Sequence, residues 1–348
     1  DTALWIGAFA TITYVFIGGF LAVSWTDTVQ ATLMIFALMI TPLFAILAIG
    51  DVPSALSMIE IEAPGKLDMF KGLDFIAIIS LLGWGLGYFG QPHILVRFMA
   101  ADSVKSIPKA RRISITWMIL CLTGAVATGF FGIAYFSDNP ALAGGVMQNN
   151  EAIFMELTKI LFNPWIAGIV LSAIMAAVMS TLSCQLLVCS SALTEDFYRA
   201  FLRPKASQKE LVWTGRIMVM LVSVVSIIIA FNPNNKVLSL VAYAWAGFGA
   251  AFGPVILLSL IWKRMTRNGA LAGIFVGAVT VILWKTCLDS LGIYEIIPGF
   301  IFCAIAIIVV LLGKKPTETM TTQFEKADEA YHEAMLELRS SRTGKTAK

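Results

Sequence analysis

The sequence alternates long stretches that contain no acidic or basic residue with shorter polar segments. A helix rises about 1.5 Å per residue and needs about 20 residues to cross the hydrocarbon core of a membrane. The stretches are continuously apolar, which favours helices over the short alternating strands of a membrane barrel. The pattern therefore predicts nine membrane-spanning helices, over residues 3–23, 28–50, 75–96, 113–137, 160–194, 217–235, 237–262, 268–284 and 296–313.

The polar segments are of two kinds: links between the apolar stretches, and a polar segment at the end of the chain. The links 51–74 and 138–159 are long enough to hold short surface helices. From Thr317 onward, apolar residues such as Tyr331 recur at roughly helical spacing among Glu and Lys, which predicts a weakly amphipathic helix. We therefore expect a transmembrane domain over residues 1–316 and a cytoplasmic tail over residues 317–348.

The charges of the links alternate along the chain. Basic residues gather in 97–112, 195–216 and 263–267, whereas acidic residues dominate 51–74 and 138–159. Short basic loops stay on the cytoplasmic side of a membrane. The chain is therefore expected to end in the cytoplasm, with the first short link, around Asp27, on the same side.

Composition agrees with this pattern and narrows the class of protein. Hydrophobic residues make up 58% and charged residues 14% of the 348 residues, and the mean hydropathy is +0.82. Soluble domains carry about 25% charged residues. The net charge of +3 gives no reason to expect a nucleic-acid partner. The five cysteines have no CxxC spacing and there are only two histidines, so neither a metal site built from cysteine or histidine nor a cofactor is expected.

The spans contain few groups able to perform chemistry. They hold no paired acids, no metal-spaced His/Cys cluster and no Ser/His/Asp set, so we expect a transporter rather than an enzyme. Proton-driven carriers usually keep an acidic or histidine group inside the membrane. Because the spans lack carboxylates, a transported ion would be held by neutral oxygens, which points to Na⁺ or a similar cation.

The stretch 171–184 is rich in small and hydroxyl residues. The carbonyl of Ala177 and the hydroxyls of Ser180 and Thr181 can gather on one side of a helix. Such a group could bind a cation. Equally, small residues let helices pack closely, and Ser or Thr hydroxyls bond to carbonyls of their own helix. Spacing alone leaves both interpretations open.

A second candidate lies between Gly83 and His93, where four glycines and a proline make a poor continuous helix. Trp84, Tyr88 and Pro92 recur every four residues and share a face. Freed backbone groups and aromatic faces could hold a zwitterion. A kinked helix with packed aromatics explains the same residues. The segment 242–254 is again small and aromatic, which suits close helix contact or bending.

Five segments carry a resemblance to the sodium/solute symporter family, and the likeness extends over essentially the whole chain. They are Gly-Gly-Phe-Leu-Ala-Val-Ser-Trp-Thr-Asp at 18–27, Gly83 to Met99, Phe162 to Asp196, Ala242 to Pro254, and Tyr294 to Phe302. The resemblance implies an all-α integral membrane protein with a five-plus-five inverted repeat. This chain would form the last nine of thirteen spans, in a bacterial inner membrane with the C-terminus cytoplasmic.

The resemblance also implies sodium-coupled uptake of a small solute, L-proline, by alternating access, and it assigns roles to individual residues. Ala177, Ser180 and Thr181 match sodium ligands on the eighth core helix. Trp84, Tyr88 and Pro92 match positions that shape the solute site on the broken sixth core helix. The remaining matches concern gating or coupling: Leu238 an outer gate, Phe154 a lid in an outer loop, and Asp27 and Arg97 charged cytoplasmic-end positions.

Alternatives remain within and outside this class. Other members of the family carry pantothenate or sugars, and the same fold serves as the membrane sensor of signalling kinases. The chain opens with Asp1 and without a signal peptide, so we expect a longer protein whose beginning precedes this sequence. The family's first core helix, which supplies further sodium ligands, is not in this chain, so residues 1–348 alone are expected not to transport.

Overall fold

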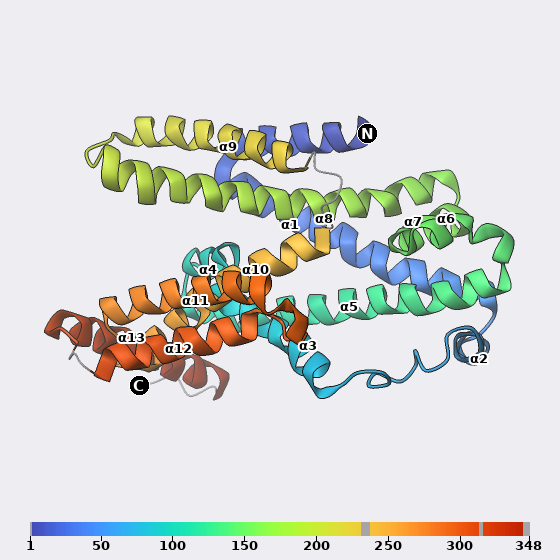
Figure 1. Cartoon of the computed structure of the whole chain (residues 1–348). Coiled ribbons are helices and arrows are strands. Elements are labelled where there is room, and N and C mark those ends of the chain that lie inside the picture. Colours follow the sequence, from blue (N-terminus) through green and yellow to red (C-terminus); the bar gives the residue numbers. More distant parts are fainter. Residues whose placement is uncertain (1, 231–236, 313–315, 344–348) are drawn as a thin grey trace. The chain divides into compact units, whose positions relative to one another are not determined.

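The computed structural model describes residues 2–230, 237–312 and 316–343, which are almost entirely helical (Figure 1). In this part of the chain η5 is a π-helix and the other η elements are 3₁₀ turns. The elements are α1 Thr2–Ile49, α2 Val52–Glu62, α3 Phe75–Gly87, η1 Tyr88–Gly90, α4 Pro92–Met99, η2 Val104–Ser106, α5 Ile107–Asp138, η3 Pro140–Leu142, α6 Gly144–Gln148, η4 Asn150–Ala152, α7 Ile153–Leu161, α8 Pro164–Ser191, η5 Ala192–Leu202, α9 Gln208–Ala230, α10 Val237–Ile261, α11 Arg267–Cys287, η6 Asp289–Leu291, α12 Ile296–Leu312 and α13 Glu318–Thr343.

The helices form two compact units. The first contains the described residues of 2–71 and 111–230, and the second those of 72–110, 237–312 and 316–343. The first unit therefore holds α1, α2, most of α5, and α6 to α9. The second holds α3, α4 and α10 to α13.

Within the described residues, six helices are each long and apolar enough to cross a membrane. The pair Phe75–Gly90 and Pro92–Met99, bent by 46°, makes a seventh span if it is counted as one, and Ile296–Val310 is a shorter apolar helix. The count of six is three lower than the nine predicted spans. The predicted spans 3–23 and 28–50 both fall within α1, the predicted span 75–96 is the bent pair, and the predicted span 296–313 is the shorter helix. The all-helical membrane fold is as predicted.

The link predicted around Asp27 is wrong, because helix α1 continues through that residue. The non-helical conformation lies earlier, at Gly19, whose φ of 54° and ψ of −142° suit a residue without a Cβ. Around Asp27 the hydroxyls of Ser24 and Thr28 donate to carbonyls of the preceding turn, so they satisfy acceptors within the helix. Glycine, rather than the charged residue, therefore marks the kink.

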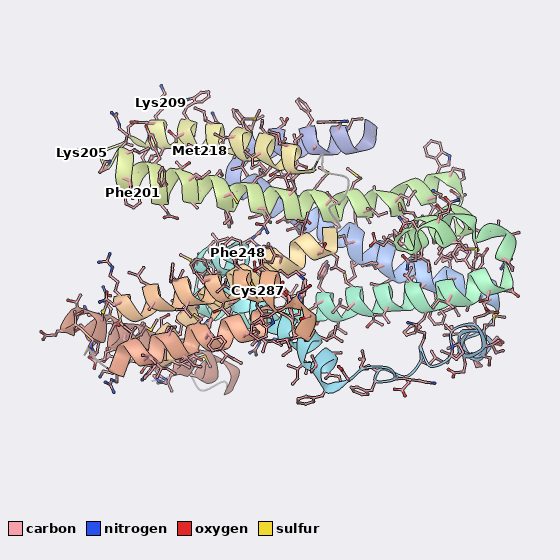
Figure 2. The ribbon with its side chains drawn as sticks, in the orientation of Figure 1. Phe201, Lys205, Lys209, Met218, Phe248 and Cys287 are labelled. Carbon is pink, nitrogen blue, oxygen red and sulfur yellow. The ribbon has the colours of Figure 1, made fainter. Side chains whose placement is uncertain are left out.

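The core of the first unit lies where α1, α8 and α9 meet. Val15 and Val23 of α1 pack with Leu186 of α8 and Val219 of α9, and all four side chains are buried. On α9, the Arg216 guanidinium lies over the Phe16 ring and donates to the Phe16 carbonyl at 3.1 Å. Lys205, in the turn after η5, and Lys209, in the first turn of α9, lie where these two helices are joined (Figure 2). This packing holds the hydroxyl-rich stretch of α8 against α1.

The second unit is held together by close helix contacts at glycine. A Cβ on Gly277 of α11 would lie 2.6 Å from the Ala250 carbonyl oxygen of α10, and one on Gly273 would lie 2.6 Å from Ile307 of α12. Helices in lipid associate through such small residues because their backbones can then approach closely. The arrangement fixes α11 against both α10 and α12.

The polar links contain the expected short helices. In α2, the Asp51 carboxylate accepts the Ser54 backbone N–H at 2.7 Å, and this bond lowers the pKa of Asp51. The link after α5 holds α6 and α7.

The tail forms the helix α13, as predicted. Its Glu325 pairs with Lys263 of the α10–α11 link, and its Glu337 pairs with Lys105 of η2. Residues 344–348, the end of the predicted tail, lie outside the described residues.

Candidate ion and solute sites

The hydroxyl stretch of α8 brings three oxygens together as its spacing predicts. The Ser180 hydroxyl donates to the Ala177 carbonyl at 3.0 Å, and the Thr181 hydroxyl donates to the same oxygen at 3.1 Å. Each hydroxyl oxygen keeps lone pairs that can face a cation, because its proton is directed at the carbonyl. The arrangement is a compact group of neutral oxygens of the type that hard cations accept.

Neighbouring residues tie this group to α1. The Tyr14 hydroxyl donates to the Met179 carbonyl at 3.3 Å, one residue before Ser180. One turn further along α8, the Cys184 thiol donates to the Asp27 carboxylate at 3.4 Å. Asp27 therefore lies against the same helix as the hydroxyl pair. Tyr14 was missed by sequence reasoning, because an interaction across 165 residues leaves no local pattern.

Phe154, the predicted lid residue, lies in the first turn of α7. Its side chain packs against a buried cluster of Ala37 from α1 with Val170 and Ala173 from α8. Ala173 is one turn before Ala177 on α8. The structure thus places Phe154, Asp27 and the oxygen group along the pair of helices α1 and α8. Helix α8 itself is continuous over Pro164–Ser191.

The predicted break in the 75–96 stretch is confirmed in the second unit. Helix α3 ends at Gly87, a 3₁₀ turn covers Tyr88–Gly90, and Gln91 is extended before Pro92 opens α4. The glycines and the proline explain the break, because glycine loses more backbone entropy in a helix than other residues and proline lacks the backbone N–H.

The aromatic residues at the break form a cluster with α10. The ring of Trp84 stacks on Trp245 with centroids 5.2 Å apart, and Tyr88 meets Trp245 edge-on at 4.9 Å. Tyr294 stacks on Trp84 at 6.3 Å, and its hydroxyl donates to the Ala242 carbonyl at 2.7 Å. Tyr88 keeps 47% of its surface exposed. Aromatic faces of this type can bind a cationic ammonium group.

Close backbone approach positions this cluster. A Cβ on Gly90 would lie 2.3 Å from the Phe248 carbonyl oxygen of α10, and Figure 2 labels Phe248 on that helix. The amide of Gln91, which is 3% exposed, donates to the Trp245 carbonyl at 3.0 Å. Sequence reasoning explained 242–254 by helix contact and missed Trp245 and Gln91 as partners of the break. Glycines on both segments were the available signal.

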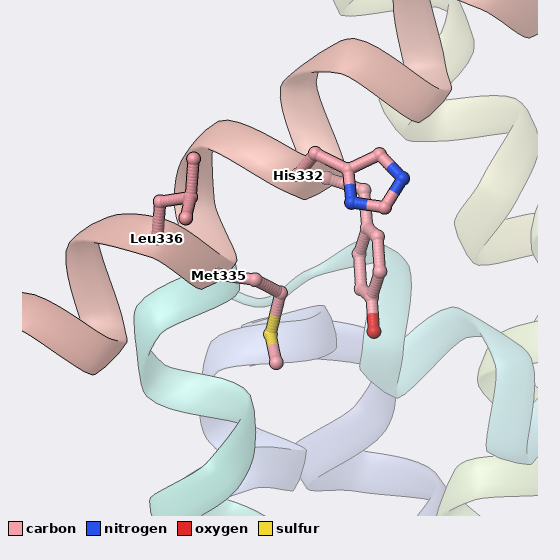
Figure 3. Close-up of a pocket in the computed structure, with 4 residues that line it drawn as sticks. His332, Met335 and Leu336 are labelled. Atoms are coloured by element: carbon pink, nitrogen blue, oxygen red, sulfur yellow. The ribbon is translucent and has the colours of Figure 1, made fainter.

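The other predicted positions lie near the ends of these helices. Arg97 is in the last turn of α4, and Leu238 is in the first turn of α10 with 70% of its surface exposed. A hollow on the tail helix, lined by Tyr331, His332, Met335 and Leu336, contains none of the predicted site residues (Figure 3). The candidate chemistry therefore lies in two places: the oxygen group of α8 and the aromatic break beside α10.

A multi-pass helical membrane protein with a broken span and a carboxylate-free oxygen group has the architecture of a secondary transporter. The model of the sodium:solute symporter family matches residues 1–277. The chain belongs to this family.

Curated relatives agree over most of the chain. The sodium/proline symporter of Escherichia coli (strain K12) is 68% identical over 335 residues, which are 96% of this chain and 66% of the relative. The sodium/proline symporter of Haemophilus influenzae is 59% identical, covering 96% and 68%, and the high-affinity proline transporter of Bacillus subtilis (strain 168) is 50% identical, covering 93% and 68%. The chain thus spans about two thirds of the length of these relatives, and slightly less for the first.

A solved structure shares the fold. It is a Na⁺-coupled sialic acid symporter in a substrate-bound, outward-open state, 20% identical, with a TM-score of 0.70 over 89% of this chain and 66% of that one. The fold class predicted from the sequence is confirmed by this likeness.

Proposed function

We propose that this protein carries L-proline into the cell together with Na⁺. The observation that carries the proposal is the agreement among relatives 50–68% identical over at least 93% of the chain, each named as a proline transporter. The two candidate sites supply fitting chemistry: neutral oxygens for an alkali cation on α8 and aromatic faces with broken backbone for a zwitterion beside α10.

In this proposal the sodium ion binds the Ala177 carbonyl and the hydroxyls of Ser180 and Thr181. The convergence of both hydroxyls on one carbonyl supports the assignment. No carboxylate is needed, because a monovalent cation can be solvated by neutral oxygens when they are held in place. The ion is cargo and leaves on the cytoplasmic side.

The solute site of the proposal lies at Trp84, Tyr88 and Pro92. The break provides backbone groups that are not committed to a continuous helix, and the aromatic rings face a cationic amine. Leu238 and Phe154 act as outer gate and lid. Asp27 acts in coupling from the interior of α1, and Arg97 acts in coupling from the last turn of α4. Binding of Na⁺ and of proline must each strengthen the other, by the same factor in both directions.

The proposal includes a bacterial inner-membrane location with the C-terminus in the cytoplasm. The basic loops support it, since Lys105, Arg111 and Arg112 lie at the junction of η2 and α5, and short basic loops stay inside. Membrane lipids surround the spans, whose exposed side chains include many large apolar ones. A nucleic-acid partner is not part of the proposal.

The test is uptake of labelled proline by the full-length transporter in proteoliposomes, driven by a Na⁺ gradient or by a proton gradient in Na⁺-free buffer. We expect accumulation only with Na⁺. Unlabelled pantothenate and sugars, added in excess, should not compete. Equal accumulation with protons alone would contradict the ion assignment, and competition by pantothenate or a sugar but not by unlabelled proline would contradict the solute.

A further inference from the structure

The side chain of Trp245 lies between the two aromatic residues of the solute site. Its indole is nearly parallel to the ring of Trp84, at an interplanar angle of 14°, and nearly perpendicular to that of Tyr88, at 85°. Trp245 thus contacts both rings at once from a different helix. Neither ring can rotate far without losing a contact with the indole.

Two hydrogen bonds tie Trp245 to the break, and Trp245 is the donor in one and the acceptor in the other. The indole N–H donates to the Trp84 carbonyl at 2.9 Å, and the Gln91 amide donates to the Trp245 carbonyl at 3.0 Å. Carbonyls in the last turn of a helix lack their usual intrahelical donors. The indole supplies a donor to one such carbonyl at the end of α3, and Gln91 ties the start of α4 to the same residue. Trp245 therefore bridges both sides of the break.

Gly87 makes this bridge possible. A Cβ at that position would lie 1.8 Å from the indole nitrogen, so only glycine lets the indole cross the end of α3. Gly85, two residues earlier in the same helix, has open space around it. Gly87 therefore has a specific reason to be glycine, because it leaves room for the Trp245 indole. A general need for backbone flexibility would apply equally to Gly85.

We propose that Trp245 is a positioning residue for the solute site, and that it fixes the separation of the Trp84 and Tyr88 rings and thereby the size of the ring that the site accepts. The inference rests on the proposed function. Trp245 acts through the two aromatic residues and the break rather than by its own contact with the ion. It also connects the break to α10, whose first turn carries Leu238, two turns before Trp245.

The test is Trp245→Phe in the full-length transporter, which keeps an aromatic ring and removes the N–H. We expect the apparent KM for proline to rise roughly fivefold, the worth of one buried hydrogen bond. We also expect the preference for proline over its six-membered-ring homologue, pipecolate, to fall by a similar factor, because the rings can then move apart. Trp165→Phe is the matched control, since Trp165 is 88% exposed on α8 and lies outside both sites.

The preference for proline over pipecolate shows whether Trp245 positions the solute site or only contributes to folding. A variant that only folds less well has fewer active molecules, which lowers the maximal rate but leaves KM and the proline-to-pipecolate ratio unchanged. If Trp245→Phe does not reach the membrane, Gln91→Met removes the second bond and decides the question by the same two readouts. Wild-type KM and wild-type preference in the variant that reaches the membrane would overturn the inference. Absence of Na⁺-driven proline uptake by the wild type would instead contradict the proposed function.

Discussion

At the scale of single residues, the proposed sodium site depends on the direction of two hydroxyl hydrogen bonds. Ser180 and Thr181 both direct their hydroxyl protons at the Ala177 carbonyl, at 3.0 and 3.1 Å. Elsewhere in the described chain, hydroxyls such as Thr11 and Thr128 donate to the carbonyl four residues before them and serve only the helix. Two hydroxyls on one carbonyl gather three oxygens within a single turn, and this convergence is the observation behind the proposed ligand set.

Replacing Thr181 by Ala removes one proposed ligand without adding bulk. Because a hydrogen-bonding or ligating group that faces a charge contributes more than one that faces a neutral partner, we expect the Na⁺ concentration for half-maximal proline uptake to rise about tenfold or more. Ser172→Ala is the matched control, since that exposed hydroxyl of α8 donates to Ile169 instead. An unchanged Na⁺ dependence in Thr181→Ala would remove Thr181 from the ligand set.

Sequence reasoning is strong for residues that are close along one helix and weak for residues brought together by folding. The gathering of Ala177, Ser180 and Thr181 follows from spacings of three and four residues. The Trp245–Trp84 bond joins residues 161 positions apart, and the Tyr14–Met179 bond joins residues 165 apart. Such contacts depend on how whole helices pack, and the sequence signals at most that two glycine-rich segments can approach closely, without showing which side chains then meet.

At the scale of elements, the break between α3 and α4 is held by backbone contacts with α10. Gly90 faces the Phe248 carbonyl and lies close to Gly249 and Gly253 of α10. A side chain at Gly90 would have to displace main-chain atoms, which cannot move as a flexible side chain can. The break is therefore a rigid part of the second unit, although its sequence is rich in glycine.

We expect Gly90→Ala to destabilise the transporter by about 1–3 kcal/mol, the usual cost of overpacking a filled interior. The thermal unfolding midpoint of the purified full-length protein measures this effect. Gly247→Ala on α10 is the control, because open space surrounds that glycine and alanine favours a helix. Equal midpoints for the two variants would show that the η1–α10 contact is loose.

The elements themselves could be predicted from hydrophobic runs, but their boundaries could not. Proline and four glycines correctly predicted the break at 88–91. The first kink was placed at Asp27, because charge was taken to end a span, whereas the chain kinks at Gly19. A single carboxylate bonded to Cys184 does not stop a helix, but a backbone in the positive-φ region interrupts one.

At the scale of the whole molecule, sequence and composition identified a helical membrane protein, because the deficit of charge extends along nearly all of the chain. The tail helix was also predicted, but its contacts were not. Glu325 and Glu337 pair with lysines of two separate links in the second unit. All four side chains are at least half exposed, so no hydrophobic pattern could have revealed the pairing.

Exposed ion pairs are weak and are screened by salt. We therefore expect the double variant Glu325→Gln/Glu337→Gln to increase amide hydrogen exchange in α13, and high salt to do the same in the wild type. The single variant Glu333→Gln changes an exposed acid of the same helix for which the structure gives no ion pair, and it serves as the control. Exchange in α13 that is insensitive both to the double variant and to salt would contradict the pairing.

The glycine contact between α3 and α10 also limits how such a transporter can diversify. A Cβ on Gly249 would lie 2.6 Å from the Gly87 α-carbon, so the two segments are spaced by main chain alone. Substitutions can change the side chains around this contact, but they cannot bring these backbones nearer, and any added atom drives them apart. A descendant that accepts a bulkier cargo must therefore shift a whole helix, whereas one that accepts a differently charged cargo of equal size needs only new side chains.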